Sequence, residues 1–143
     1  EDVIRDVSGF ILETGMPPLQ LSGTAKICLS VGYRTDDMDV ALGSALLLTA
    51  LGERGYAELL GHHLMEGFGA SRRPDLALAW YETGIEASER DRMAVFAPDN
   101  PERIGVIRKA AYELNGEDGK AADLTGDGGV QPASALPSFN IKE

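Results

Sequence analysis

The chain has a single cysteine, aromatic residues at only 6% of the total, and no long hydrophobic run. Because Cys28 has no second cysteine to pair with, a disulfide within the chain is excluded. Its apolar surroundings predict that the thiol packs as a small hydrophobic side chain. The longest mostly apolar run, residues 41–51, has 11 residues, whereas a membrane-spanning helix needs about 20. No membrane insertion is therefore expected from this sequence.

Basic residues are also scarce. The chain carries 13 Lys and Arg against 23 Asp and Glu, a formal net charge of −10. Nucleic-acid binding without sequence preference depends on basic clusters that neutralise phosphates, and binding to anionic membranes depends on similar clusters. Both classes of function are disfavoured. A protein partner, or a ligand with cationic groups, fits this charge better, and the same charge also serves solubility.

At 143 residues, the chain is long enough for one domain with its own core. Ala, Leu and Gly are plentiful, which suits closely packed helices better than a β-sandwich rich in Val, Ile, Thr and Tyr. We therefore expect an all-α fold. Because the chain begins at Glu1 without an initiator methionine, we also expect it to be a processed product or part of a longer protein.

Apolar residues recur with helical spacing along most of the chain. In the first helix, Val3, Val7, Phe10 and Ile11 share one face. The predicted helices cover residues 2–14, about 22–34, about 38–53 and 101–114, with two more between 56 and 87.

Boundary residues support several of these helix ends. The Pro17–Pro18 pair is expected to end the first helix, and Asp37 or Asp39 to cap the third. For the last helix, Asn100 is the predicted N-cap and Pro101 the predicted first helical residue.

The most informative stretch is residues 56–87, which read as one helix–loop–helix unit. Gly61 and Ala77 are small where the two helices would cross, so their backbones can approach closely. Gly67 and Gly69 allow the positive φ angles of a tight loop. Trp80 is expected to fill the space between this hairpin and its neighbour. A single hairpin cannot bury such a face alone, so other helices must stack on it.

These residues carry a resemblance to a known family. The order and spacing of Leu60–Gly61, Gly67-Phe-Gly69, Ala77 and Trp80–Tyr81 resemble the Sel-like repeat, a tetratricopeptide-related helical repeat. One departure is Arg73, which stands where the family has a loop aspartate.

A second, degenerate copy resembles the same pattern upstream. It uses Leu29, Tyr33, Asp37, Ala41 and Gly52 with a shortened loop between the helices, and it lacks the Trp-Tyr pair and the Gly-x-Gly.

The resemblance implies a short α-solenoid of antiparallel helical hairpins with about two repeats. Repeat one would cover residues 22–53 and repeat two residues 56–87, with capping helices over 2–14 and 101–114. An extended, Gly- and Asp-rich C-terminal tail would follow over residues 116–143.

His62, His63 and Glu66 form the one cluster that looks like a site. His62 and Glu66 are four residues apart, so both side chains lie on one helix face and are able to reach one metal ion. His63 points about 100° away, and no Cys or His cluster offers a further ligand. In the repeat interpretation this helix lines the concave groove, which makes the three residues candidates for partner contact. A plain solvated surface is the alternative.

The tail ends in an apolar segment. We expect Leu136, Phe139 and Ile141 to dock in extended form on the helical surface of the same chain, of a second copy or of a partner protein.

Together these features predict a non-catalytic protein–protein interaction module, an adaptor or a regulatory or accessory subunit that binds a partner protein through its groove. No cofactor and no metal are expected. Two alternatives stay open: a metal-dependent enzyme that uses His62 and Glu66, and a structural subunit of a larger complex, with a homo-oligomer as another form of assembly. The resemblance implies a bacterial accessory protein, in the cytoplasm or in the periplasm and cell envelope.

Overall fold

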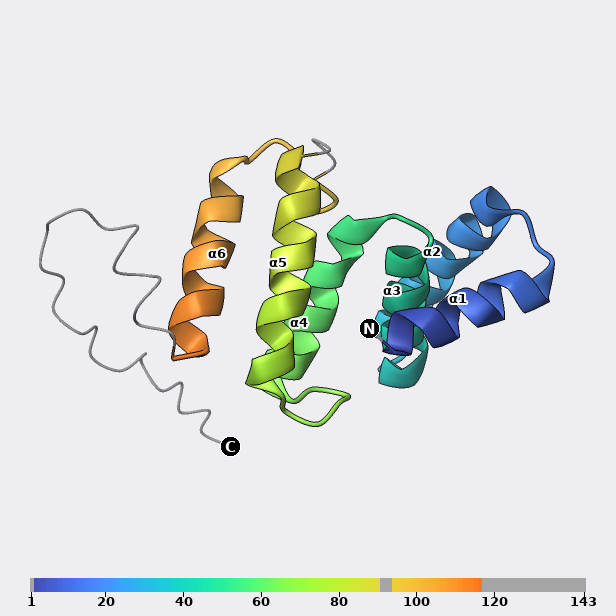
Figure 1. The fold of residues 1–143 in the computed structure, drawn as a ribbon, viewed down its shortest axis with the longest axis horizontal. Coiled ribbons are helices and arrows are strands. Elements are labelled where there is room, and N and C mark those ends of the chain that lie inside the picture. The colour runs from blue at the N-terminus through green and yellow to red at the C-terminus, as the bar shows by residue number, and fades with distance from the viewer. Residues whose placement is uncertain (1, 91–93, 117–143) are drawn as a thin grey trace, which may run out of the picture.

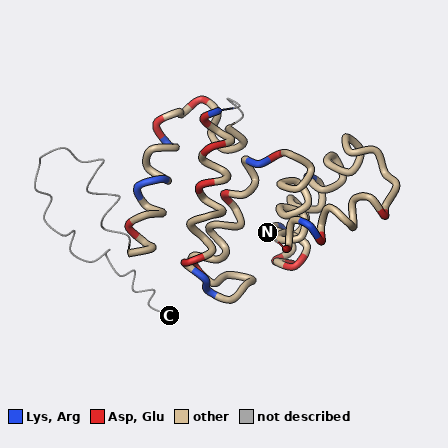
Figure 2. The backbone as a smooth tube through the Cα atoms, in the orientation of Figure 1, with Lys and Arg blue, Asp and Glu red and all other residues tan. Residues whose placement is uncertain are grey.

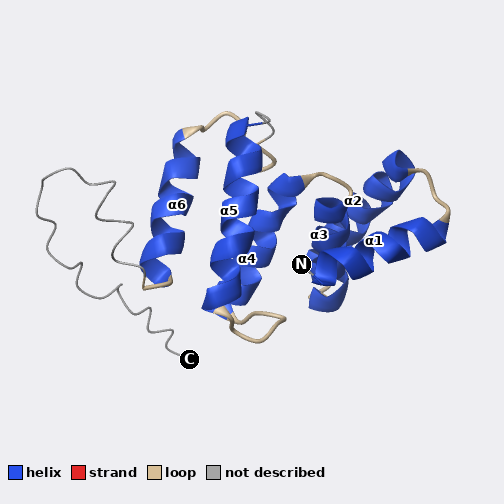
Figure 3. Cartoon of the chain, viewed as in Figure 1, coloured by secondary structure: helices blue, strands red, loops and turns tan. Residues whose placement is uncertain are grey.

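The computed structural model describes residues 2–90 and 94–116. Within these ranges the chain forms helices joined by short connections, and no strand occurs there (Figures 1 and 3). The elements are α1 (Asp2–Thr14), α2 (Pro18–Arg34), α3 (Met38–Ala50), the short 3₁₀ helix η1 (Arg54–Tyr56), α4 (Ala57–Glu66), α5 (Pro74–Arg90) and α6 (Glu102–Leu114). An all-α fold with six α-helices is therefore confirmed for the described residues. The tail predicted to dock, with Leu136, Phe139 and Ile141, lies outside them.

Two predicted helix starts were wrong, both next to proline. Helix α2 begins at Pro18 rather than near Ser22, because proline is well suited to the first turn of a helix and does not only end one. Helix α6 begins at Glu102, so Pro101 and not Asn100 occupies the N-cap position, and no side chain caps that end. The predicted cap of α3 is confirmed at Asp37, whose carboxylate accepts a hydrogen bond from the Val40 N–H at 3.2 Å.

The helices pack as antiparallel pairs (Figure 1). Helix α2 lies against α3, α4 against α5, and α6 continues the row by packing on α5. Helix α1 crosses the first pair and touches mainly α3. Among the described helices, none combines the length and the apolar character that crossing a membrane requires.

The buried side chains form two clusters at the junctions between these pairs. The first joins α2 and α3 to Leu60 of α4, and Trp80 of α5 packs against it. The predicted role of Trp80 as a filler between hairpins is therefore confirmed. The second joins α4, α5 and α6 around Met65, Tyr81 and Ala111.

Helix α1 is attached more loosely than its apolar face predicts. None of its residues is fully buried, and Val3 and Phe10 remain 49% and 54% exposed. Val7 and Phe10 instead line an apolar hollow of about 620 Å³ between α1 and the α2–α3 pair. The reason is geometric, since α1 lies across the pair and touches it with only part of one face.

Helices α4 and α5 approach each other closely through one glycine on each. A Cβ added at Gly61 would lie 2.8 Å from the Tyr81 ring, and one added at Gly84 would lie 2.8 Å from the backbone nitrogen of Glu58. Ala77 completes the contact and is fully buried. The prediction that small residues occupy the crossing is confirmed at Gly61 and Ala77, and Gly84 adds a third small residue there.

Replacing Gly84 with alanine should therefore destabilise the fold, because the new methyl group meets rigid backbone rather than a movable side chain. We expect Gly84→Ala to lower the free energy of unfolding by about 1–3 kcal/mol. Gly105→Ala is the control, since nothing lies within 4 Å of a Cβ at Gly105 in α6. The control should raise stability by up to about 1 kcal/mol through helix propensity. Urea denaturation measures the free energy of unfolding of both variants. Equal changes in the two variants would contradict the close crossing of α4 and α5.

Candidate functional site

One open hollow of about 520 Å³ between α2 and the end of α4 is lined by His62, His63 and Glu66. Helix α2 contributes one side chain, and α4 and the residues that follow it contribute the rest. The lining residues are Tyr33, Leu59, His62, His63, Glu66, Gly67 and Phe68. His62, His63 and Glu66 are thus brought together at one surface feature.

The end of α4 is held in place by its glycines. Gly67 takes a left-handed conformation with φ 73°, which ends the helix, and its N–H and that of Phe68 both donate to the His63 carbonyl oxygen. Gly69 packs so tightly on the start of α3 that an added Cβ would lie 2.5 Å from the Met38 Cβ. The loop after α4 is therefore fixed against α3, which places Phe68 at the edge of the hollow.

His63 is buried, with only 5% of its surface exposed, and both of its ring nitrogens are engaged. Nδ1 lies 2.6 Å from the Phe68 carbonyl oxygen, which can only accept, so Nδ1 carries a proton and donates. Nε2 lies 2.6 Å from the Tyr33 hydroxyl. With the proton on Nδ1, Nε2 is the acceptor of this tautomer and the Tyr33 hydroxyl, whose pKa is raised by burial, donates to it. His63 thereby ties α4 to α2.

The same three residues form a row of aromatic rings. The Tyr33 and His63 ring centroids are 5.7 Å apart with 26° between the planes, and those of His63 and Phe68 are 5.8 Å apart with 21° between the planes. The outer two rings are partly open to solvent, Tyr33 at 39% and Phe68 at 54%. The hollow therefore exposes the Tyr33 and Phe68 rings, and the His63 ring between them is held in place by hydrogen bonds.

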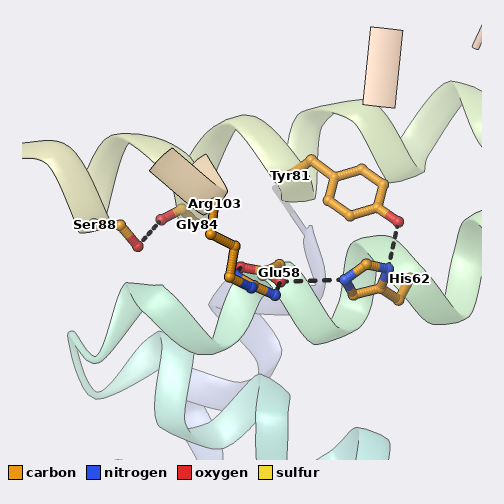
Figure 4. Close-up of polar contacts among 6 residues, drawn as sticks. All are labelled: Glu58, His62, Tyr81, Gly84, Ser88 and Arg103. Atoms are coloured by element: carbon orange, nitrogen blue, oxygen red, sulfur yellow. Dashed lines mark hydrogen bonds and ion pairs between the residues drawn. The ribbon is translucent and has the colours of Figure 1, made fainter. Parts of the chain in front are cut away.

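His62 is also engaged on both sides, and its partner is Glu58 rather than Glu66 (Figure 4). Nε2 lies 3.2 Å from Glu58 Oε1, and Nδ1 lies 2.8 Å from the Tyr81 hydroxyl. The Glu58 carboxylate can only accept, so Nε2 carries the proton and the Tyr81 hydroxyl donates to Nδ1. Burial, together with the charges of Glu66 and Glu58, raises the pKa of Tyr81 to about 12. His62 thus ties α4 to α5.

Glu58 is a buried carboxylate that links α4 to α6. Both guanidinium NH groups of Arg103 donate to its two oxygens, one at 2.9 Å, and His62 completes the set (Figure 4). Burial alone would raise the pKa of Glu58. The hydrogen bonds from His62 and Arg103 and the positive charge of Arg103 outweigh burial and lower this pKa to about 2. The carboxylate is ionised and satisfied at neutral pH.

This arrangement does not favour a metal centre on His62 and Glu66. Among the described residues, no group of three His, Cys, Asp or Glu side chains is placed to hold a metal ion. Both nitrogens of His62 already face protein groups. Glu66 lines the hollow on its own, and no ion pair or hydrogen bond engages it within residues 2–90 and 94–116.

Two residues of the hollow were not singled out as site residues from sequence. In the sequence, Tyr33 is one position of the degenerate repeat copy, and Phe68 is only the residue between two loop glycines. An aromatic residue in a glycine loop is a usable signal, because such a loop exposes its side chains. No local sequence pattern predicts the Glu58–Arg103 ion pair, because 45 positions separate the two residues.

The pKa of Glu58 makes stability depend on pH. Its folded value, about 2, lies below the ordinary value of 4.5, so the stabilisation is complete above pH 4.5 and is lost as pH falls toward 2. At neutral pH the ionised Glu58 carboxylate contributes on the order of 3 kcal/mol to the free energy of unfolding. We expect Glu58→Gln to lose that amount and to show a flatter pH profile in urea denaturation. The exposed Glu86→Gln should keep the wild-type profile. If the free energy of unfolding fell with pH equally steeply in Glu58→Gln and in the wild type, Glu58 would not be the group responsible.

No family model, curated protein or solved structure matches this chain. Its function is therefore inferred from the geometry of its own residues.

Proposed function

We propose that the chain is a non-catalytic interaction module, an adaptor or accessory subunit, that binds a partner protein in the groove between α2 and α4. The observation that carries this proposal is the open hollow of about 520 Å³ with Tyr33 and Phe68 partly exposed on its rim. Exposed aromatic residues beside a defined hollow are typical of the centres of protein interfaces.

The arrangement of the helices supports this proposal. Helices α2 and α4 are the first members of two successive antiparallel pairs, and both contribute to the hollow. In a two-repeat α-solenoid, as the resemblance to the Sel-like repeat implies, the first helices line the concave side. We propose that α2–α3 and α4–α5 are two such repeats, with α1 and α6 as flanking helices.

The state of the polar side chains favours binding over catalysis. His62 and His63 use both ring nitrogens for hydrogen bonds within the fold, so neither is poised as a general base toward the hollow. Tyr33 donates its hydroxyl proton to His63. Among the described lining residues, Glu66 alone keeps a charged group for an incoming partner.

A photocrosslinker tests this proposal directly. Phe68 is replaced by p-benzoylphenylalanine, and the protein is irradiated in cells of its source organism. We expect a discrete crosslinked product with one partner protein, because the side chain of Phe68 lies at the rim of the hollow.

The matched control is the same replacement at Phe10, which is equally exposed at 54% but lies on α1 at a different hollow. A partner that crosslinks from position 68 and not from position 10 supports the groove. If position 68 yields no product, or the same products as position 10, the proposed function is wrong.

A further inference from the structure

We propose that the hollow between α2 and α4 is a receptor for an arginine side chain of the partner protein, stacked on an exposed ring, Tyr33 or Phe68, and paired with Glu66. This inference rests on the proposed function and adds the chemistry of the partner. Its volume, about 520 Å³, falls within the range of about 300–1,000 Å³ that is usual for ligand sites.

The rings provide the stacking surface. Tyr33 and Phe68 each stack on the buried His63 ring, with 26° and 21° between the planes, and both remain partly exposed within one hollow. A guanidinium group is planar and weakly hydrated, and it stacks on aromatic faces. Because His63 is hydrogen-bonded on both sides, the central ring is fixed before a ligand arrives. Such preorganisation reduces the entropic cost of binding.

Glu66 provides the countercharge. It is an exposed residue in the last turn of α4 that lines the hollow, and within the described residues no ion pair neutralises it. Glu58, the neighbouring acid on α4, differs, because Arg103 already neutralises it. Glu66 is therefore the carboxylate that remains for a ligand.

The charges around the hollow favour a cation. The turn between α2 and α3 carries Asp36 and Asp37, and it lies at the same end of the molecule as the loop after α4 (Figure 2). That loop also touches α3 at Met38.

The basic residues at this end of the molecule offset these acidic charges only in part. Arg73 is paired with Asp75 at 2.6 Å, whereas Arg72 donates its Nε–H to the neutral Met65 carbonyl oxygen at 2.9 Å and so keeps a positive charge that offsets one carboxylate. Arg34, at the end of α2, offsets one acidic charge. With the net charge of −10 for the whole chain, the field at the hollow attracts a basic side chain.

Arginine fits better than lysine for a geometric reason. The guanidinium group is able to stack its face on an aromatic ring and to donate two parallel hydrogen bonds to one carboxylate. A lysine ammonium is a compact, strongly hydrated charge without a face to stack.

The test uses a peptide probe and nuclear magnetic resonance. The full chain, labelled with ¹⁵N, is titrated with acetyl-Gly-Arg-Gly-amide and, separately, with the peptides in which citrulline or lysine replaces arginine. Citrulline keeps the planar shape and removes the charge. We expect saturable shifts at the backbone amides of His63, Gly67 and Phe68 with the arginine peptide, and an affinity lower by about tenfold with citrulline and by a smaller factor with lysine.

Two variants and two controls locate the site. Glu66→Gln and Phe68→Ala should each weaken binding of the arginine peptide by about fivefold to tenfold. Glu13→Gln removes an exposed carboxylate on α1, and Phe10→Ala removes an equally exposed aromatic ring, so both should leave the affinity unchanged. Equal affinities for arginine and citrulline, shifts centred on α1, or no saturable shift would overturn the arginine assignment.

Failure of this inference is distinguishable from failure of the proposed function. If the arginine peptide does not bind while crosslinking from position 68 still captures a partner that position 10 does not, the groove binds a partner by other chemistry. If neither occurs, both proposals are wrong.

Discussion

The close crossing of α4 and α5 fixes where the polar contacts of α4 form. Gly61 lets the Tyr81 ring lie directly on α4, and Gly84 lets the backbone of α5 reach Glu58. At this separation the Tyr81 hydroxyl meets His62, and His62 in turn meets Glu58. A larger residue at either glycine would separate the helices and stretch this chain of hydrogen bonds. Small side chains therefore determine where the polar network forms.

Helix α4 uses successive polar residues to hold its neighbours. Glu58 reaches α6 through Arg103, His62 reaches α5 through Tyr81, and His63 reaches α2 through Tyr33. Each of these groups would be costly to bury without a partner, so each pairing makes one arrangement of helices strongly preferred. Helix α4 is consequently the element around which the two pairs and α6 are assembled.

The same pairings change the meaning of the histidines. In sequence they resemble contact or ligand residues, because histidine on an exposed helix face is often functional. In the fold their ring nitrogens are occupied by the protein itself. What the hollow presents to a partner is the surface of the Tyr33 and Phe68 rings and the carboxylate of Glu66. The histidines act as supports that hold this surface in position.

Local spacing and residue size are enough to predict the helical class, most helix boundaries, the small residues at the crossing and the role of Trp80. The sequence also brought His62, His63 and Glu66 forward, since they follow one another on one helix. Only the tertiary structure decided which carboxylate pairs with His62, that Arg103 neutralises Glu58, and that Tyr33 joins Phe68 at the hollow. Glu58 and Glu66 both lie four positions from His62, so spacing does not choose between them. The contacts of Tyr33 with His63, of His62 with Tyr81 and of Arg103 with Glu58 join residues 19 to 45 positions apart, and no local pattern encodes them. They follow from how closely the helices pack, which only the folded chain defines.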